Sequence, residues 1–195
     1  KDLVYEFPEA LLCGVDVVKE PLYKLARENV NIPLFRFDLL QCPLKDDIID
    51  VLVMLNVLEH IEDDQKAILK AINLLKPGGI LILEVPAGPN LYDSYDAELM
   101  HFRRYSGKIL MNKICSAGFE IKRISHLGFL IYPAFAAVKL FHRLLNHNGA
   151  KTVKKRAGST ISSPLLRFLI EFEVNFLSRF SLPLGIRCLL VAKKP

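Results

Sequence analysis

Polar side chains follow several short apolar runs of this chain, at points where strands of an open α/β sheet bind their ligands. The first is Asp16, the second is Asp38, and the third is the segment Asn56–His60. A carboxylate at a strand tip accepts hydrogen bonds from both hydroxyls of a ribose, which is the chemistry we expect of Asp16. The alternatives are structural: Asp16 caps the helix that Pro21 begins, and Asp38 closes an Asx-turn.

Two histidines are candidate general bases. The ordinary pKa of an imidazole lies near neutrality, so His60 and His101 are suited to accept a proton from an attacking group. For His60 the alternative is a structural role, in which it packs on a ligand or caps a helix. Glu59 is expected to order the same loop, and we predict no metal site because no second cluster of ligands accompanies it.

A basic and aromatic run, His101–Ser106, precedes a predicted helix. Its arginines, Arg103 and Arg104, have the planar donor geometry that binds carboxylates and phosphates. The alternative is that both arginines pair with upstream acids and fix the loop. Those acids are Asp93, Asp96 and Glu98. Tyr92 either lines the same pocket or only packs.

Apolar runs that alternate with amphipathic segments are expected to position these groups. Continuous apolar runs are typical of strands buried on both faces of a parallel sheet, and helices between them indicate a doubly wound α/β sheet. The turn Pro77-Gly78-Gly79 ends one helix, and Ser106 caps another. The predicted strands are Leu11–Val15, Leu34–Phe37, Val51–Leu55, Ile80–Val85, Phe119–Ile124 and Ile186–Ala192.

Residues 129–185 interrupt this alternation and are predicted to form an amphipathic helical insert before the last strand. Its helices are expected at Pro133–His147 and Pro164–Phe180, with the polar, basic segment Gly149–Ser163 between them. Lys139 falls on the polar side of the first helix. Such helices usually pack on the sheet as a lid. The alternative is peripheral contact with a membrane, because basic residues alternate with phenylalanine and leucine.

The composition and net charge of the chain indicate its domain size, its type of partner and its redox environment. The chain has 195 residues, a hydrophobic content of 51% and a net charge of +5, which suits a single domain over residues 1–195 with its sheet core at 1–128 and 186–195. Nine Lys or Arg and no acid lie between residues 121 and 170. This block indicates either a solvated surface or contact with something anionic. Four dispersed cysteines predict reduced thiols in a cytoplasmic protein, with membrane association left open.

The ordered motifs resemble those of the class I S-adenosylmethionine-dependent methyltransferases. They are Cys13-Gly14-Val15-Asp16-Val17, Phe37-Asp38-Leu39, Asn56-Val57-Leu58-Glu59-His60 and Leu75-Lys76-Pro77-Gly78-Gly79. The resemblance covers residues 10–125 and 186–194, and it implies a mostly parallel, Rossmann-like sheet whose last strand lies antiparallel beside its predecessor. It also implies S-adenosylmethionine as the cofactor. The cofactor contacts that it assigns are Gly14, Asp16, Val17, Asp38, Leu39, Asn56, Val57 and His60.

The resemblance also extends to the acceptor side. In this family a run similar to His101–Ser106 borders the acceptor pocket. Substrate contacts are therefore assigned to Tyr92, His101, Arg103, Arg104 and Tyr105. The acceptor is expected to be a small molecule, a lipid-linked compound or a glycan, and nucleic acid is not favoured as a partner.

One feature of the family has no counterpart in this sequence. Its first strand ends in a glycine-rich turn of the kind Gly-x-Gly-x-Gly, which lets the backbone approach the cofactor. Here the run Leu11–Val15 already corresponds to the family's second strand, and Lys1–Phe7 corresponds to the end of its first helix. We therefore expect a piece of a longer enzyme or, less economically, a decayed paralogue.

The resemblance thus implies transfer of a methyl group to an oxygen, nitrogen or carbon nucleophile, mostly through alignment of an in-line attack. Two alternatives stay open. One is an NAD-dependent oxidoreductase on the same sheet, for which Asp16 is equally suited. The other is a non-catalytic module with a degenerate methyltransferase fold that binds a membrane or a partner through residues 129–185.

Overall fold

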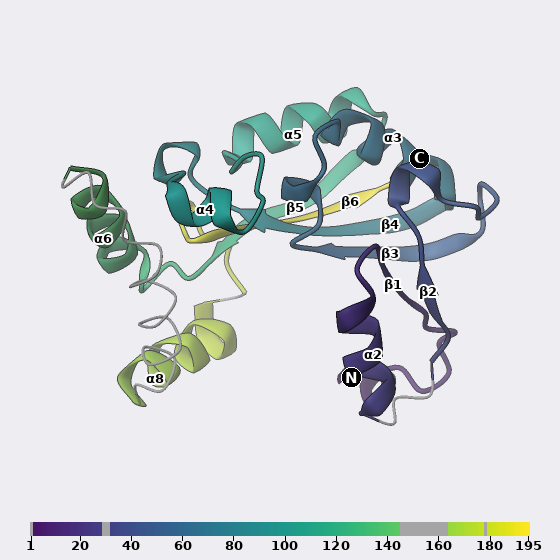
Figure 1. Ribbon diagram of the computed structural model, residues 1–195, viewed down its shortest axis with the longest axis horizontal. Coiled ribbons are helices and arrows are strands. Elements are labelled where there is room, and N and C mark those ends of the chain that lie inside the picture. The colour runs from purple at the N-terminus through teal and green to yellow at the C-terminus, as the bar shows by residue number, and fades with distance from the viewer. Residues whose placement is uncertain (1, 29–31, 145–163, 178) are drawn as a thin grey trace. The chain divides into compact units, whose positions relative to one another are not determined.

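The structure is a computed structural model that describes residues 2–28, 32–144, 164–177 and 179–195 (Figure 1). It divides into two compact units, residues 1–44 and 45–195. The basic segment predicted at 149–163 lies outside the described residues. Each unit is an α/β assembly in its own right, so each is described by itself.

The first unit is a pair of parallel strands with helices before and between them. Strand β1 pairs with β2 in the register Gly14↔Leu34 and Asp16↔Arg36. A Cβ atom added to Gly14 would lie 2.8 Å from Cδ2 of Leu34, so this glycine permits close packing inside the unit. The elements are α1 (Asp2–Glu6), β1 (Gly14–Asp16), α2 (Lys19–Arg27), β2 (Leu34–Arg36) and the 3₁₀ turn η1 (Leu39–Gln41).

The second unit contains a four-stranded sheet in the order β3-β4-β6-β5. Strands β3 and β4 are parallel, whereas β6 is antiparallel to both β4 and β5. The prediction that the last strand lies antiparallel beside its predecessor is therefore confirmed. The strands are β3 (Ile49–Leu55), β4 (Leu75–Pro86), β5 (Glu120–Leu127) and β6 (Arg187–Lys193). The helices and helical turns are η2 (Leu58–His60), α3 (Asp64–Leu74), η3 (Pro89–Leu91), α4 (Ser94–Glu98), α5 (Gly107–Ser116), α6 (Tyr132–Leu144), α8 (Pro164–Phe172) and η4 (Glu173–Leu177).

Local chemistry explains where the helices of this unit begin and end. The Asp63 side chain accepts a hydrogen bond from the N–H of Lys66 at the start of α3, and Ser106 accepts one from Ile109 at the start of α5. Gly78 and Gly118 have φ values of 81° and 97°, which glycine adopts at little cost. The predicted cap at Ser106 and the stop at Gly118 are therefore confirmed, whereas helix α3 ends at Leu74, before the predicted stop at Pro77-Gly78-Gly79.

One face of the four-stranded sheet forms the core of the second unit. Helices α3 and α5 lie on that face (Figure 1). Their side chains bury the strand residues that point toward them. These residues include Leu81, Leu83, Val85, Cys188, Leu190 and Ala192, each at most 1% exposed.

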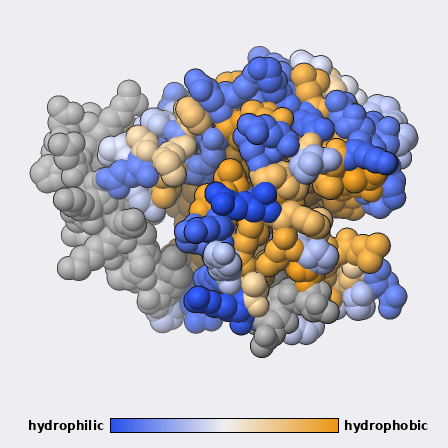
Figure 2. Space-filling view, turned by 45° about the vertical axis from the view of Figure 1, so that its right-hand side comes forward, coloured by the Kyte–Doolittle hydropathy of each residue, from blue (hydrophilic) through white to orange (hydrophobic). Residues whose placement is uncertain are grey.

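The other face of this sheet is apolar and partly open. Val51, Val53 and Leu55 alternate along β3 and are 52%, 40% and 52% exposed. Elsewhere too, hydrophobic side chains, shown in orange, reach the molecular surface among hydrophilic ones (Figure 2). The strand predicted at 51–55 is confirmed, but the expected burial on both faces is wrong, because the helices that pack on the sheet lie on one side.

The predicted insert begins with helix α6 and continues, after residues that are not described, with α8 and the π-helical turn η4. Lys139 was expected on the polar side of the first helix, and the structure buries it there at 8% exposure. The reason is a pair of carboxylates within reach of its ammonium group, Asp93 at 2.6 Å and Asp96 at 3.1 Å. Within the described part of the chain, no helix has the length and apolar character needed to cross a membrane.

Candidate functional site

Two predicted cofactor residues lie at neighbouring strand ends in the first unit. Asp16 ends β1, and its Oδ1 accepts a hydrogen bond of 2.8 Å from the N–H of Val18. Asp38 follows the adjacent parallel strand, and its Oδ1 accepts one of 2.9 Å from the N–H of Leu40. The Asx-turn expected as the alternative for Asp38 is therefore formed. Asp16 makes a similar local contact, but it does not cap the following helix, whose N-cap residue is Val18. Each carboxylate keeps a second oxygen, so the turns leave room for a ligand hydroxyl or amine.

In the second unit, the loop after β3 begins with an unusual backbone conformation. Asn56 has a φ of 53°, a left-handed conformation that asparagine tolerates better than most residues. Its N–H donates to the carbonyl oxygen of Glu84 at 3.0 Å, and its side-chain oxygen accepts from the guanidinium of Arg187. No local sequence pattern indicates Arg187 as a partner of Asn56, because it lies 131 positions further along the chain.

The side chains of the helical turn η2 point in different directions, two toward the interior and one toward solvent. Leu58 and Glu59 are fully buried at 0% exposure, whereas His60 is exposed. Both carboxyl oxygens of Glu59 are buried without a hydrogen-bond partner among the described residues. Burial raises the pKa of Glu59 to about 7, and the nearby backbone N–H of Glu59 itself and the charge of Arg187 counteract part of that rise.

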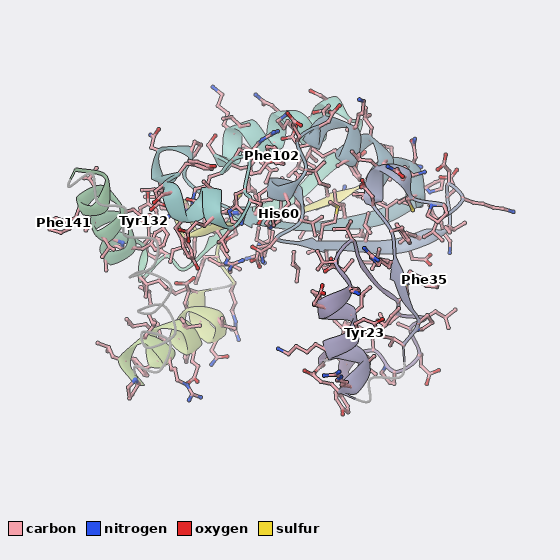
Figure 3. The ribbon with its side chains drawn as sticks, viewed as in Figure 1. Tyr23, Phe35, His60, Phe102, Tyr132 and Phe141 are labelled. Atoms are coloured by element: carbon pink, nitrogen blue, oxygen red, sulfur yellow. The ribbon has the colours of Figure 1, made fainter. Side chains whose placement is uncertain are left out.

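The two candidate bases come together in space. The rings of His60 and His101 meet edge to face with their centroids 4.7 Å apart. The loops that carry them are joined by a hydrogen bond of 2.8 Å from the N–H of Phe102 to the carbonyl oxygen of Glu59, and Figure 3 shows His60 and Phe102 close to one another. Burial lowers the pKa of His101, although its hydrogen bond to Asp96 acts in the opposite direction.

Asp96 is the centre of a buried ion-pair cluster. Both of its oxygens accept from Nε of Arg104 at 2.9 Å, and Lys139 lies 3.1 Å away. Nδ1 of His101 lies 3.2 Å from the same carboxylate. Burial by itself would raise the pKa of Asp96, but its bond to Arg104 and the charges of Arg104 and Lys139 lower that pKa to about 2. Arg104 thus fixes the loop, as the structural alternative predicts.

The neighbouring arginine has a different acidic partner. Arg103 lies 3.0 Å from Oδ2 of Asp64 and donates to the carbonyl oxygen of Glu62 at 2.7 Å. The hydroxyl of Tyr105 donates to the same Asp64 oxygen at 2.9 Å. Burial and this bond raise the pKa of Tyr105. The sequence analysis considered only the nearer acids Asp93, Asp96 and Glu98 as partners of the arginines, and it therefore missed Asp64.

A hollow of about 310 Å³ opens on one side of this loop system. Its walls come from the loop after β4, the start of α5, the end of β5 and residues 183–185, and Tyr105 lines it. Tyr92 lies elsewhere on the loop, where its hydroxyl donates to the carbonyl oxygen of His101 at 2.8 Å. The second unit therefore gathers His60 and all the predicted acceptor-side residues on connected loops, whereas Gly14, Asp16, Val17, Asp38 and Leu39 belong to the first unit.

Comparison with known proteins places a family match across the candidate cofactor residues. Residues 3–83 match the family described as "Methyltransferase domain". A probable S-adenosylmethionine-dependent methyltransferase from Mycolicibacterium smegmatis is 29% identical over 123 residues, which are 62% of this chain and 48% of that protein. An uncharacterized 37.1 kDa protein of a Streptomyces fradiae transposon is 27% identical over 141 residues, which are 69% of this chain and 40% of that protein. The chain thus spans less than half the length of these two curated relatives.

Solved structures share the fold at low sequence identity. A methyltransferase from Mesorhizobium loti has a TM-score of 0.63 and 13% identity, with 99% of this chain and 84% of that chain covered. A possible histamine N-methyltransferase from Thermotoga maritima has a TM-score of 0.58 and 16% identity, with 98% and 76% covered.

The family match and these relatives support methyl transfer rather than the hydride transfer that Asp16 alone left open. The mostly parallel α/β arrangement agrees with the fold of the two solved methyltransferases. The chain is thus similar to the S-adenosylmethionine-dependent methyltransferases, through the family match over residues 3–83, the Mycolicibacterium smegmatis relative and the shared fold.

Proposed function

We propose that the protein to which this chain belongs transfers a methyl group from S-adenosylmethionine to a small-molecule, lipid-linked or glycan acceptor. The observation that carries the proposal is the family match over residues 3–83, which includes the strand ends at Asp16 and Asp38 and the loop Asn56–His60. Bound S-adenosylmethionine supplies an electrophilic methyl group on a sulfonium. The protein's part is then to bind, to align the acceptor and to remove a proton where the acceptor carries one.

The residues on the cofactor side suit a nucleoside. Asp16 and Asp38 follow neighbouring parallel strands, so their carboxylates lie at the same end of that strand pair. One oxygen of each is used by a local backbone N–H, and the other is available for a hydroxyl or an amine. In the second unit, the left-handed Asn56 turns the chain sharply at the end of β3, where open α/β sheets bind ligands.

The residues on the acceptor side suit proton removal. His60 is exposed, and His101 beside it is held by Asp96 through Nδ1. A carboxylate that fixes one ring nitrogen orients the ring and leaves the other nitrogen for an external group. Since Arg103 and Arg104 are already engaged by Asp64 and Asp96, we assign them to the shape of the loop and the proton-accepting role to the histidine pair.

Calorimetry with S-adenosylhomocysteine tests the cofactor assignment. Asp16→Asn keeps an oxygen for the N–H of Val18 but removes the charge and one acceptor, so we expect binding at least about tenfold weaker, equivalent to 1.4 kcal/mol. Glu20→Gln is the matched control, because it removes an acid from the nearby α2 and is expected to bind as the unchanged chain does. Absence of binding by a full-length protein that includes this chain contradicts the proposal, as does equal binding by Asp16→Asn.

A second proposal concerns the insert, which we propose contacts an anionic membrane surface. Leu165, Phe168, Phe176 and Phe180 are 61–67% exposed along the segment that begins with α8. Phe141, at 61% exposure, lies on the outer part of α6 (Figure 3). In the sequence, residues 121–170 carry nine Lys or Arg and no acid. Exposed aromatic residues in a segment with such an excess of basic residues are typical of helices that lie in a membrane interface.

Co-sedimentation with vesicles tests this second proposal. We expect the chain to sediment with vesicles that contain an anionic lipid and less with neutral ones. The double variant Phe168→Ser and Phe176→Ser is expected to stay in the supernatant. Met100→Ser, which removes another exposed apolar side chain at 76% exposure, is the control and is expected to sediment normally. If the double variant sediments as the control does, the insert is not the contact surface.

A further inference from the structure

Glu59 is an unusual residue for the interior of a protein. Its side chain is fully buried, and neither carboxyl oxygen has a hydrogen-bond partner in the described part of the chain. Burying a carboxyl group without a partner is costly, and buried acids are nearly always paired or bound to a cation. The carboxylate of Glu59 therefore needs a hydrogen-bond donor or a cation that the described residues do not supply.

Two imidazoles stand beside this carboxylate. Glu59, His60 and His101 each offer one ligand atom, and these atoms lie within 4.8 Å of one another. One carboxylate and two imidazoles form a donor set that suits zinc and related divalent cations. Zinc–ligand bonds of about 2.0–2.1 Å place two tetrahedral ligands about 3.4 Å apart, so the side chains need to close by roughly 1.4 Å at most. His60 is exposed, which gives it room to move and gives a cation a route from solvent.

The environment of His101 adds an independent observation. Its Nδ1 lies 3.2 Å from Oδ1 of Asp96, and that carboxylate is itself held by Arg104 and Lys139. Histidines that bind metals nearly always donate their other ring N–H to a carboxylate, a carbonyl or water, which fixes the tautomer and the ring orientation. Asp96 thus leaves Nε2 of His101 as the nitrogen that can bind a cation.

We propose that Glu59, His60 and His101 bind a divalent cation of the zinc type. Each residue has a distinct role in this site. The cation supplies the missing partner of Glu59, His101 is oriented by Asp96, and His60 closes the site from the solvent side. This proposal differs from the sequence-based expectation of no metal site. It was hidden because His101 is 42 positions beyond Glu59, so no ligand spacing is visible in the sequence.

Three protein ligands leave a tetrahedral cation one further position, which is the pattern of sites that bind water or a substrate. With a cation bound, the two imidazoles act as ligands and no longer accept a proton. The open position would then receive an oxygen of the methyl acceptor and favour its deprotonated form, with the proton released to solvent. This role rests on the proposed methyl transfer, whereas cation binding itself does not. The two are therefore measured separately.

Titration calorimetry of the untagged, chelator-treated full chain with zinc tests the site in the absence of S-adenosylmethionine. We expect one saturable site. Loss of an outer partner of a ligand typically costs 10–100-fold in metal affinity, so Glu59→Gln, His101→Gln and His60→Ala, which each remove a ligand, are expected to cost about 100-fold or more. His126→Gln is the matched control, because Nδ1 of His126 is bonded to the carbonyl oxygen of Leu182 at 2.9 Å, and it is expected to bind zinc as the unchanged chain does.

Cobalt(II) absorption shows which atoms bind. Cys13, Cys42 and Cys115 are exposed or partly exposed thiols and are the obvious competitors for a soft cation. We expect a spectrum of nitrogen and oxygen ligation that is lost in His101→Gln, without the charge-transfer bands of thiolate ligation. Thiolate bands, no saturable site, or equal affinity in the ligand variants and in His126→Gln would overturn the proposal. His60→Ala changes an exposed side chain, so its result is independent of any effect on folding.

Discussion

Nζ of Lys139 lies 3.1 Å from Oδ2 of Asp96 and 2.6 Å from Oδ1 of Asp93. This contact ties helix α6 to the loop that carries His101. Lys139→Ala leaves the buried Asp96 with fewer partners, so we expect a loss of about 1–3 kcal/mol in the free energy of unfolding and faster hydrogen exchange in α6. Lys108→Ala, an exposed lysine of α5, is the control and should change stability by less than about 0.5 kcal/mol. Unchanged exchange in α6 would show that other contacts hold the helix.

The two adjacent arginines are predicted to differ in their contribution to stability. The side chain of Arg104 is 6% exposed and that of Arg103 is 32% exposed. Arg104→Gln leaves a buried carboxylate without its main partner, which costs about 3–5 kcal/mol, whereas Arg103→Gln is expected to cost about 1 kcal/mol or less. Urea unfolding of both variants measures the difference. Equal losses would contradict the distinction between them.

Acid stability should depend on Asp64. Burial alone would raise its pKa, but hydrogen bonds from Lys113, Tyr105 and Arg103 lower it below the usual 3.8. A lowered folded-state pKa means that the stabilisation is complete at pH values above 3.8 and is lost as the pH falls below that value. The stability advantage of the unchanged chain over Asp64→Asn should therefore shrink between pH 5 and pH 3 in urea unfolding. Glu98→Gln, at an exposed site, should show no such change, and a constant advantage for Asp64 would rule out this linkage.

Two substitutions test whether the left-handed backbone conformation of Asn56 affects stability, because both remove the same side-chain contact. Asn56→Gly and Asn56→Ala both remove the side-chain contact with Arg187, but only alanine is strained at a φ of 53°. A left-handed conformation costs a residue with a Cβ atom roughly 1–2 kcal/mol, so Asn56→Ala should be less stable than Asn56→Gly by about that amount. Thermal unfolding of the pair measures it. Equal stability would mean that the loop relaxes to another conformation.

The sequence predicted local elements better than the contacts between them. Ser106 and Gly118 set the limits of α5 by chemistry that acts within a few residues, and the strand ends at Asp16 and Asp38 follow from apolar runs. The junction between α3 and β4 was less accurate. The helix ends at Leu74 and the strand begins at Leu75, because the turn at 76–79 is accommodated within the ladder between β3 and β4.

The site depended on long-range pairing that no local pattern shows. Lys139 reaches Asp96 from 43 positions away, and Arg103 chooses Asp64 rather than the nearer acids proposed for it. A pattern of polar and apolar residues indicates which face of a helix is polar. It does not indicate whether that face packs against solvent or against a buried carboxylate from a distant part of the chain. The complete burial of Glu59 was not expected either, since charged residues are rarely fully buried.

The position of β6 in the sheet determines when the second unit can fold during translation. This strand pairs with β4 on one side and β5 on the other, yet it is synthesised after both. Until residues 187–193 have left the ribosome, β4 and β5 lack the neighbour that joins them, and their unpaired edges are exposed. We therefore expect the nascent sheet to close only after translation of β6, so that premature stop codons anywhere before Arg187 yield chains that chaperones and proteases treat as unfolded.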